Sequence, residues 1–126
     1  MNSRELGKWG EERARIYLEE KGYIVVEKNF RCPAGEIDII ARDGEWLVFV
    51  EVKTRRSTRY GYPAEAVDFR KQVKYIQTAL YYLNRKKLLN SLYRFDIVEV
   101  KVGKQGNYII NHITNAFQSA HRKYFF

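Results

Sequence analysis

Three charged residues near the middle of the chain have the types and spacing that phosphodiester chemistry needs. Asp38 interrupts the apolar run 37–40, and Glu51 and Lys53 stand two residues apart at the end of the apolar segment 46–50. Ionised groups are costly in such surroundings, so each needs an explanation. Two carboxylates that converge beside a lysine can hold a hard cation such as Mg2+ or Mn2+, with a substrate phosphate completing the shell. The cation would neutralise the phosphate and activate a bound water, while the ammonium would stabilise the developing charge.

The two carboxylates converge only if the segments that carry them form a hairpin. Asp43-Gly44 separates the β-forming segments 36–42 and 45–54, and Asp-Gly between apolar runs is a strong hairpin signal. With these two residues as the turn, paired residue numbers sum to 87. Asp38 then faces Phe49, and Glu36 faces Glu51. Asp38 and Glu51 would be diagonal neighbours on one face, with Cβ atoms ~7 to 8 Å apart.

The E-x-K triplet has an ordinary interpretation as well. Such spacing is common, and taken alone it usually marks an ion pair at a sheet edge. The prediction of an active site therefore rests on the combination of Glu51 and Lys53 with Asp38, the hairpin and the apolar strand. A three-residue turn with a bulge would shift the pairing, so the turn decides how the carboxylates meet.

Other elements must position this hairpin. Apolar residues near a 3.6-residue period predict a helix over 4–21, with Ser3 as N-cap and Gly22 as its stop. A second amphipathic helix should follow the hairpin and end near 84–87. Its core stripe would consist of apolar side chains at Ala66, Phe69, Val73, Ile76, Leu80 and Leu83.

The rest of the chain reads as strands and connections. These are a strand over 23–30, a turn over 31–35, a basic loop over 55–63, a strand over 92–102, a turn over 103–106 and a strand over 108–114. Together the elements predict one α/β domain over residues 1–126 with a mixed sheet. A helix precedes a three-stranded antiparallel meander, a crossover helix and further strands, and the order of the strands stays open.

Composition excludes several classes of protein. A chain of 126 residues with 45% hydrophobic and 30% charged residues is typical of one soluble globular domain. Its longest apolar run, 46–50, is far shorter than the ~20 residues that cross a bilayer, and residues 1–5 contain no apolar signal core. The single cysteine, Cys32 beside Pro33, fits an inert loop thiol in a reducing compartment. We therefore expect a cytoplasmic protein.

The charge favours a polyanionic partner. There are 23 basic and 15 acidic residues, a net charge of +8, and the isoelectric point is about 9.6. Residues 53–74 alone contain seven basic residues against two acidic ones. A basic, aromatic surface suits phosphate contacts and base stacking, although it could also serve solubility alone. The candidates for substrate binding are Arg55, Arg56, Lys71 and Lys74, interleaved with Tyr60, Tyr62 and Gln72.

The remaining titratable and aromatic residues have plainer interpretations. Asp96 is expected to be a buried structural acid that answers a basic residue. Glu36 could be an acid behind the site or an exposed edge residue. His112 and His121 have no partner at a zinc spacing, which indicates ordinary polar positions. The aromatic tail, Tyr124, Phe125 and Phe126 with Phe117, should pack on the domain or on a second subunit.

The charged triad resembles a known active site. Asp38 followed by Glu51-Val52-Lys53 is similar to the D...E-x-K core of the PD-(D/E)XK, restriction-endonuclease-like nucleases. Several further segments resemble the bacterial YraN family of predicted endonucleases, related to archaeal Holliday junction resolvases, nearly end to end. They are Gly10-Glu11 with Ala14 and Tyr17-Leu18, Asn29-Phe30-Arg31, Gly35-Glu36-Ile37-Asp38, residues 48–55 and Arg94-Phe95-Asp96.

The resemblance carries its own expectations. It implies a restriction-endonuclease-like fold and a Mg2+- or Mn2+-dependent endonuclease that cuts branched or structured DNA. It also implies that Glu11 joins Asp38 and Glu51 at the metal, and that two copies form a homodimer, because symmetric cutting of a four-way junction needs two active sites. The sequence departs from the superfamily name in one respect, since Pro33 does not directly precede Asp38.

Fold does not determine function, so other classes stay open. The chain could be a basic nucleic-acid-binding or adaptor protein that keeps the nuclease scaffold without turnover. RNA is a further candidate substrate, which a parallel DNA and RNA binding titration would distinguish. Binding to a membrane surface is the least favoured, because neither predicted helix combines a strongly basic face with exposed apolar anchors.

Overall fold

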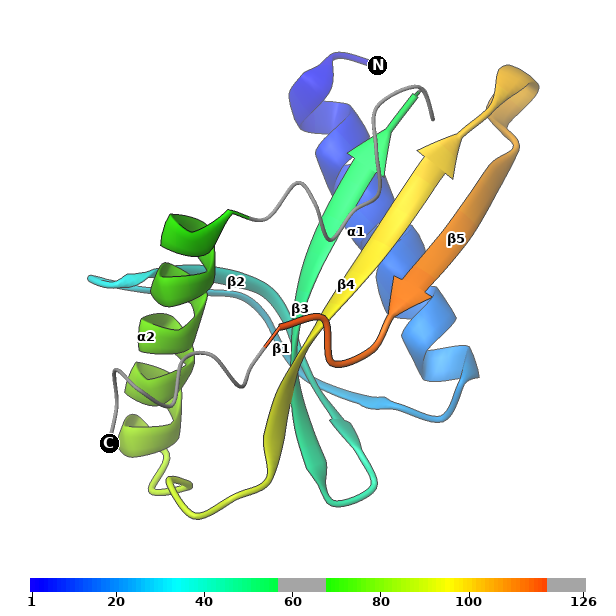
Figure 1. Ribbon diagram of the computed structural model, residues 1–126. Coiled ribbons are helices and arrows are strands. Elements are labelled where there is room, and N and C mark those ends of the chain that lie inside the picture. The colour runs from blue at the N-terminus through cyan, green and yellow to red at the C-terminus, as the bar shows by residue number, and fades with distance from the viewer. Residues whose placement is uncertain (57–67, 118–126) are drawn as a thin grey trace.

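The computed structural model of the chain describes residues 1–56 and 68–117. Tyr60, Tyr62, Ala66, His121 and the aromatic residues 124–126 lie outside the described residues. The helices and strands follow one another as shown in Figure 1. They are α1 Ser3–Glu20, β1 Ile24–Cys32, β2 Gly35–Asp43, β3 Trp46–Arg55, α2 Phe69–Arg85, β4 Tyr93–Val102, the 3-10 turn η2 Lys104–Gly106 and β5 Tyr108–Ile113.

The five strands form one mixed sheet whose order equals the chain order, β1-β2-β3-β4-β5. Neighbouring strands are antiparallel except β3 and β4, which are parallel. Parallel neighbours need a crossover connection, and α2 lies within the connection here. The predicted α/β fold is confirmed, with its opening helix, antiparallel meander and crossover helix. The strand order, which sequence left open, makes β3 the central strand.

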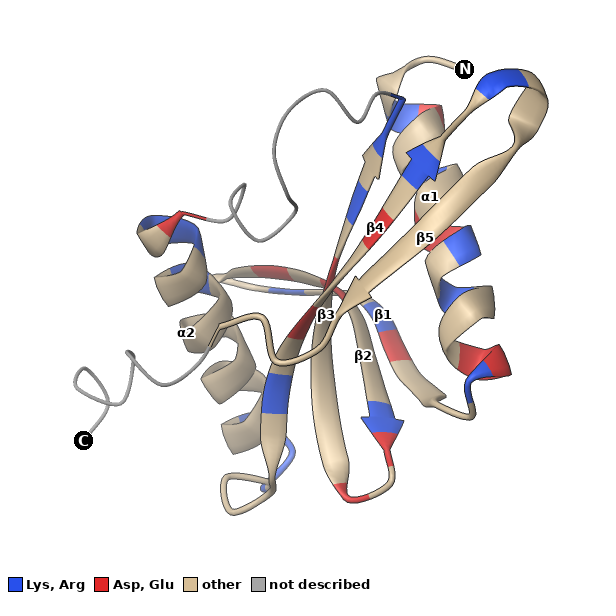
Figure 2. Cartoon of the chain, turned by 45° about the vertical axis from the view of Figure 1, so that its right-hand side comes forward, with Lys and Arg blue, Asp and Glu red and all other residues tan. Residues whose placement is uncertain are grey.

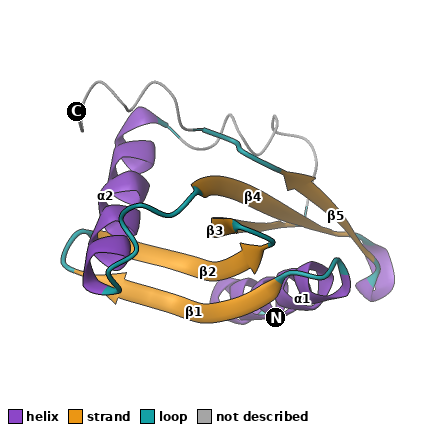
Figure 3. Cartoon of the chain, turned by 90° about the horizontal axis from the view of Figure 1, so that it is seen from below, coloured by secondary structure: helices purple, strands orange, loops and turns teal. Residues whose placement is uncertain are grey.

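The two helices cover opposite faces of this sheet, as Figures 1 and 3 show. On β3, Leu47 and Phe49 enter the core beneath α2, whereas Val48 and Val50 enter the core beneath α1. A strand covered on both faces needs apolar residues at every position, which explains the continuous run 46–50. No helix in the described part of the chain is long and apolar enough to cross a membrane.

The helix boundaries depend on short polar caps. The side chain of Asn2 accepts a hydrogen bond from the Glu5 amide, and the Glu5 carboxylate accepts one from the Asn2 amide. Asn2 rather than Ser3 is therefore the N-cap of α1, which corrects the sequence prediction by one residue. The helix ends before Gly22, whose φ of +94° suits glycine, as predicted.

The second helix corrects part of the predicted core stripe. It begins after Asp68, whose carboxylate caps the Lys71 amide. Ile76 and Leu83 are buried as predicted, but Phe69 is 51% exposed. The first turn of α2 contributes nothing to the core beneath the helix, which is built instead around residues 76–83. Periodicity identified the apolar stripe but not how far along the helix the sheet would cover it.

Candidate active site

The β2-β3 hairpin turns one position later than the sequence predicted. Asp43 pairs with Trp46, so the turn residues are Gly44 and Glu45 rather than Asp43 and Gly44. Gly44 has a φ of +59°, and a glycine at the first central position fits a type II′ turn. Paired residue numbers consequently sum to 89 instead of 87. The shift is two positions in the pairing, so every side chain keeps its predicted face.

This register brings the two central carboxylates closer than predicted. The ladder runs from Asp43 to the Ile39–Val50 pair, and Asp38 and Glu51 are the next residues beyond its last pair. Their carboxyl groups are joined by a hydrogen bond. The Asp38 carboxylate Oδ2 accepts a hydrogen bond of 2.8 Å from the Val52 amide. Asp38 thus bonds the backbone just beyond the last regular pair, which holds its side chain beside Glu51.

Glu36 does not face Glu51, as the register of 87 required. It pairs across the β1-β2 hairpin with Arg31, and the Glu36 carboxylate lies 3.1 Å from the Arg31 guanidinium. Its side chain is 62% exposed. Of the two interpretations that the sequence allowed, the exposed edge residue is therefore the one observed.

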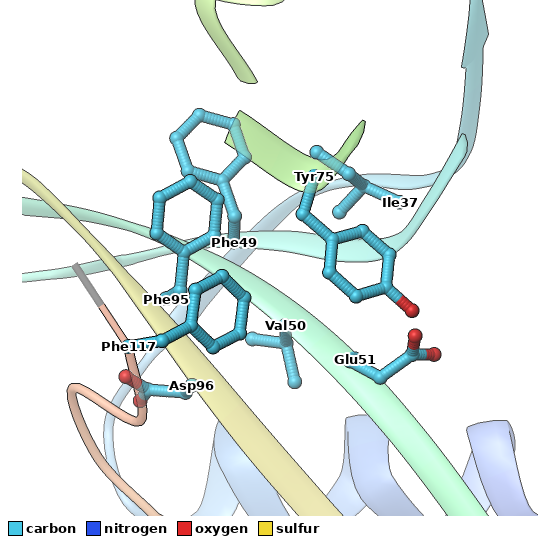
Figure 4. Close-up of a pocket in the computed structure, with 8 residues that line it drawn as sticks. All are labelled: Ile37, Phe49, Val50, Glu51, Tyr75, Phe95, Asp96 and Phe117. Carbon is cyan, nitrogen blue, oxygen red and sulfur yellow. The ribbon is translucent and has the colours of Figure 1, made fainter. Parts of the chain in front are cut away.

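Glu51 is held in an environment that disfavours its ionised form. The pKa of its carboxyl is raised to about 9. Burial is the largest cause, a hydrogen bond with Asp38 and repulsion by its charge raise the pKa further, and the charges of Lys53 and Lys71 oppose the shift. Figure 4 shows the Glu51 carboxylate and the Tyr75 hydroxyl pointing toward one another beside a small cavity of about 10 Å3.

The walls of this cavity are mostly apolar. Beside Glu51, Tyr75 and the carboxylate residue Asp96, it is lined by Ile37, Phe49, Val50, Phe95 and Phe117. These side chains keep water from the inner side of Glu51, which is the physical cause of its desolvation.

Lys53 lies on the same face of β3, two residues beyond Glu51. Burial lowers the pKa of its ammonium, the charge of Glu51 raises it, and the neighbouring Lys71 lowers it again. The first turn of α2 therefore brings Lys71 to Lys53. Figure 2 shows basic positions on the last part of β3 and on the first turns of α2. The two lysines form a concentrated positive charge beside the carboxylate pair.

Glu11 on α1 lies near Asp38 because a glycine lets the helix pack closely on β3. A Cβ built on Gly10 would lie 1.8 Å from Oγ1 of Thr54, so α1 can sit this close to β3 only without a side chain at position 10. The next residue, Glu11, is half-buried. Burial raises the pKa of its carboxyl, the charge of Asp38 raises it further, and a hydrogen bond from Asn29 lowers it. Glu11 and Asp38 are thus electrostatic neighbours.

The predicted substrate-binding residues separate into two groups. Lys71 reaches the site, and Lys74 is exposed one helical turn later on α2. Arg55 follows Lys53 on the same face of β3, and its Nε lies 2.7 Å from the fully buried carboxylate of Glu99. Arg56 donates instead to the carbonyl oxygen of Met1, which places its guanidinium beside the start of α1.

Asp96 is the buried structural acid that the sequence predicted. It bonds Arg94 Nε at 3.0 Å, the Asn115 amide at 2.9 Å and His112 Nε2 at 2.7 Å. The His112 side chain is only 3% exposed, so the prediction of an ordinary polar position missed a buried partner of Asp96. The signal was weak, because the two residues lie 16 positions apart.

Asn29 is the other residue whose role the sequence did not reveal. It lies in β1, has a φ of +53° and hydrogen-bonds Glu11. A polar residue with low strand propensity inside the β-forming segment 23–30 was the available signal.

The donor set fits a hard divalent cation. Asp38 and Glu51 offer carboxylate oxygens from neighbouring strands, and a cation between them would offset the burial and the repulsion that keep a proton on Glu51. Within residues 1–56 and 68–117, no three His, Cys, Asp or Glu side chains are arranged to hold a metal ion. The pair would accordingly supply two ligands, and Glu11 is the electrostatic neighbour of Asp38.

Comparison with known proteins places the chain in a family. The family model described as "Uncharacterised protein family UPF0102" matches residues 10–100. A UPF0102 protein of Caldicellulosiruptor saccharolyticus is 50% identical over 118 residues, covering 93% of this chain and 100% of the relative. One of Clostridium acetobutylicum is 46% identical over 117 residues, covering 92% and 96%. The chain therefore belongs to the UPF0102 family, the YraN family that its sequence pattern resembles.

Proposed function

We propose that the protein is a Mg2+- or Mn2+-dependent endonuclease that hydrolyses phosphodiester bonds in DNA. The observation that carries this proposal is the meeting of the Asp38 and Glu51 carboxyl groups just beyond the last pair of the β2-β3 ladder, with Lys53 beside them on β3. A structural role alone does not account for two carboxyl groups brought together next to an apolar wall, because one of them must keep a proton there, which costs stability as pH rises.

Each residue has a distinct task in this proposal. Asp38 and Glu51 hold the cation, which when bound supplies charge neutralisation at the phosphate and a more acidic water. Glu11 adds a third carboxylate from α1. The Lys53 ammonium, whose position is set by the strand, donates hydrogen bonds to the attacking water or to the phosphate oxygens as negative charge develops. Lys71 contributes a second ammonium for the phosphate.

The basic surface supports a nucleic acid as substrate. Lys71 and Lys74 on α2 are exposed, and Arg55 lies on the same strand and face as Lys53. Contacts from such residues to phosphates depend strongly on salt and carry no base specificity. The resemblance to Holliday junction resolvases favours branched or structured DNA. By the same reasoning we propose a homodimer, which would present two active sites to a four-way junction. We also propose a cytoplasmic location, which the single cysteine supports.

The test is cleavage of a labelled panel of a four-way junction, a flap, a single strand, a duplex and RNA. Each is incubated with Mg2+, Mn2+ or a chelator. We expect cutting by the wild-type protein that chelator abolishes and that Asp38→Asn reduces on the order of 10³-fold, while DNA binding persists. Glu45→Gln, an exposed acid in the turn of the same hairpin, is the matched control and should cut normally. Equal cutting by Asp38→Asn and wild type would refute the site.

A non-catalytic nucleic-acid-binding or adaptor role is the second candidate. It is favoured by the observation that the described residues contain no group of three His, Cys, Asp or Glu side chains arranged around an ion position. Salt-sensitive binding to DNA or RNA, without metal affinity and without cutting of any substrate in the panel, would support this role instead.

A further inference from the structure

Glu99 on β4 is a buried acid that packing of the sheet does not require. Its side chain is fully buried, as are the neighbouring Val98 and Val100. Removing a carboxylate from water costs free energy even where it is paired, and an apolar side chain of similar size commonly serves stability as well or better. The presence of a carboxylate at this position therefore calls for a reason other than the stability of the core.

The two oxygens of Glu99 face two different cations. Oε2 lies 2.7 Å from Nε of Arg55 on β3, and Oε1 lies 3.5 Å from Nζ of Lys101, two residues further along β4. The side chains of Arg55 and Lys101 are 20% and 30% exposed, whereas that of Glu99 is 0% exposed. The acid is therefore buried, while both basic groups that it holds reach the surface.

The register of the two parallel strands places this cluster next to the candidate active site. Lys53 pairs with Glu99, and Arg55 pairs with Lys101. The carboxyl ends of β3 and β4 lie side by side, as Figure 1 shows. Arg55 stands two residues beyond Lys53, which is roughly 7 Å along a strand. The two cations held by Glu99 thus extend the positive charge of the site along the end of the sheet.

The composition of this cluster suits a phosphate group. One carboxylate against two cations leaves an excess positive charge among Glu99, Arg55 and Lys101. A guanidinium has five donors in a planar fork, so its geometry allows it to bond a carboxylate and a phosphate together. Ordering a long basic side chain costs conformational entropy. A buried acid that fixes both side chains reduces their freedom before a ligand arrives.

We propose that Arg55 and Lys101 bind a phosphate of the nucleic acid next to the one that is cut, and that Glu99 is the positioning residue that holds both. The inference rests on the proposed nucleic-acid substrate and deepens it, because it identifies where the backbone beyond the scissile phosphate is held. Arg55 was a candidate from the sequence, whereas Lys101 and Glu99 follow from the structure.

Glu99→Gln separates a positioning role from a purely electrostatic one. The variant removes a negative charge, so it should bind DNA more tightly if Glu99 only offsets nearby cations. If Glu99 positions Arg55 and Lys101, binding should instead weaken about 3- to 10-fold, and the slope of log affinity against log salt should become smaller by about one. Fluorescence anisotropy of a labelled four-way junction, titrated in chelator at several salt concentrations, measures both quantities without cutting.

Lys101→Gln and Arg85→Gln form a matched pair, since each removes one cation. Arg85 is exposed in the last turn of α2. Lys101→Gln should weaken binding and reduce the salt slope by about one, whereas Arg85→Gln should keep the wild-type slope. If circular dichroism shows that Glu99→Gln does not fold, this pair decides the question. Equal slopes for Lys101→Gln and Arg85→Gln would overturn the inference.

A combined variant tests the route of the effect. If Glu99 acts through the two cations, Glu99→Gln causes no further loss of affinity in an Arg55→Gln, Lys101→Gln background. A further loss there, or tighter or unchanged binding by Glu99→Gln alone, would overturn the inference and leave the proposed function intact. If the wild-type protein shows no salt-dependent binding to the junction, the proposed substrate fails, and this inference fails with it.

Discussion

Two carboxylate sites on the neighbouring strands β3 and β4 differ in how the protein compensates their charges. Asp96 on β4 pairs with Val50 of β3, and Glu51 is the next residue along β3. Around Asp96, an arginine, a histidine and a backbone amide supply hydrogen bonds. Glu51 instead hydrogen-bonds a second carboxylate, that of Asp38.

The opposite pKa shifts express this difference. Burial alone would raise the pKa of Asp96, but hydrogen bonds from His112, Arg94 and Asn115 outweigh it and lower the pKa below its ordinary value of 3.8. Burial also raises the pKa of Glu51, and Asp38 raises it further instead of compensating. The charge of Asp96 is compensated by the protein itself, whereas the Glu51 site would gain from the cation that we propose. Burial of an acid indicates function only when the protein itself leaves its charge uncompensated.

Removal of the Asp96 carboxylate should have the largest effect on stability. In Asp96→Ala, Arg94 and His112 lose their buried acceptor. We expect the free energy of unfolding to fall by about 3–5 kcal/mol, the usual cost of leaving a buried charge without its partner. Urea unfolding followed by circular dichroism measures this change, with Glu45→Ala as an exposed control. A loss below about 1 kcal/mol would show that the network contributes little.

A methyl group added to α1 at position 10 should lower both the stability of the protein and metal binding at the candidate site. Gly10→Ala places a Cβ against Thr54, so the helix must move away from β3. We expect a loss of about 1–3 kcal/mol, together with weaker Mn2+ binding because Glu11 moves with the helix.

Gly7→Ala is the matched control for this change. A Cβ at Gly7 meets nothing within 4 Å, so this variant should be unchanged or stabilised by up to about 1 kcal/mol through helix propensity. Equal behaviour of the two alanine variants would contradict close packing of α1 on β3.

Glu51→Gln should alter how stability depends on pH. In the metal-free native protein Glu51 keeps its proton up to about pH 9, whereas in the unfolded chain it ionises near its ordinary value of 4.5. The native state binds more protons in between, so the wild-type free energy of unfolding should fall as pH rises across this range. The variant lacks this group, and its stability should vary less.

Chemical unfolding at several pH values in chelator measures the slope. Asp38→Asn should flatten the profile too, because it removes the repulsion acting on Glu51, whereas Glu45→Gln should keep the wild-type slope. Parallel profiles for wild type and Glu51→Gln would mean that Glu51 ionises normally in the folded protein.

The exposed ion pair between Arg31 and Glu36 in the β1-β2 hairpin should have the smallest effect on stability. Arg31 and Glu36 are 77% and 62% exposed, and water screens such pairs. Arg31→Gln should change the free energy of unfolding by no more than about 0.5 kcal/mol, as measured by urea unfolding. A loss of stability similar to that of Asp96→Ala would mean that solvent exposure does not determine how much an ion pair contributes to stability.

Most helices and strands could be predicted from the sequence. Apolar periodicity located both helices, because local patterns report which faces are covered. The strand order, and with it the central position of β3, could not be predicted in this way. The sequence predictions were wrong where a turn or a helix cap could lie one residue earlier or later. The turn uses Gly44 at its first central position rather than its second, and Asn2 rather than Ser3 caps α1.

The sequence by itself determined that Asp38, Glu51 and Lys53 share one side of a hairpin, because a strand alternates faces every residue and a register shift of two preserves that alternation. Tertiary structure alone decided that the Asp38 carboxyl bonds that of Glu51, that Lys71 reaches Lys53 and that Asn29 lies beside Glu11. These contacts join separate elements, and they depend on turn geometry and on how closely Gly10 lets α1 pack on β3. No local pattern of residues encodes such distances, since they result from packing of the whole chain.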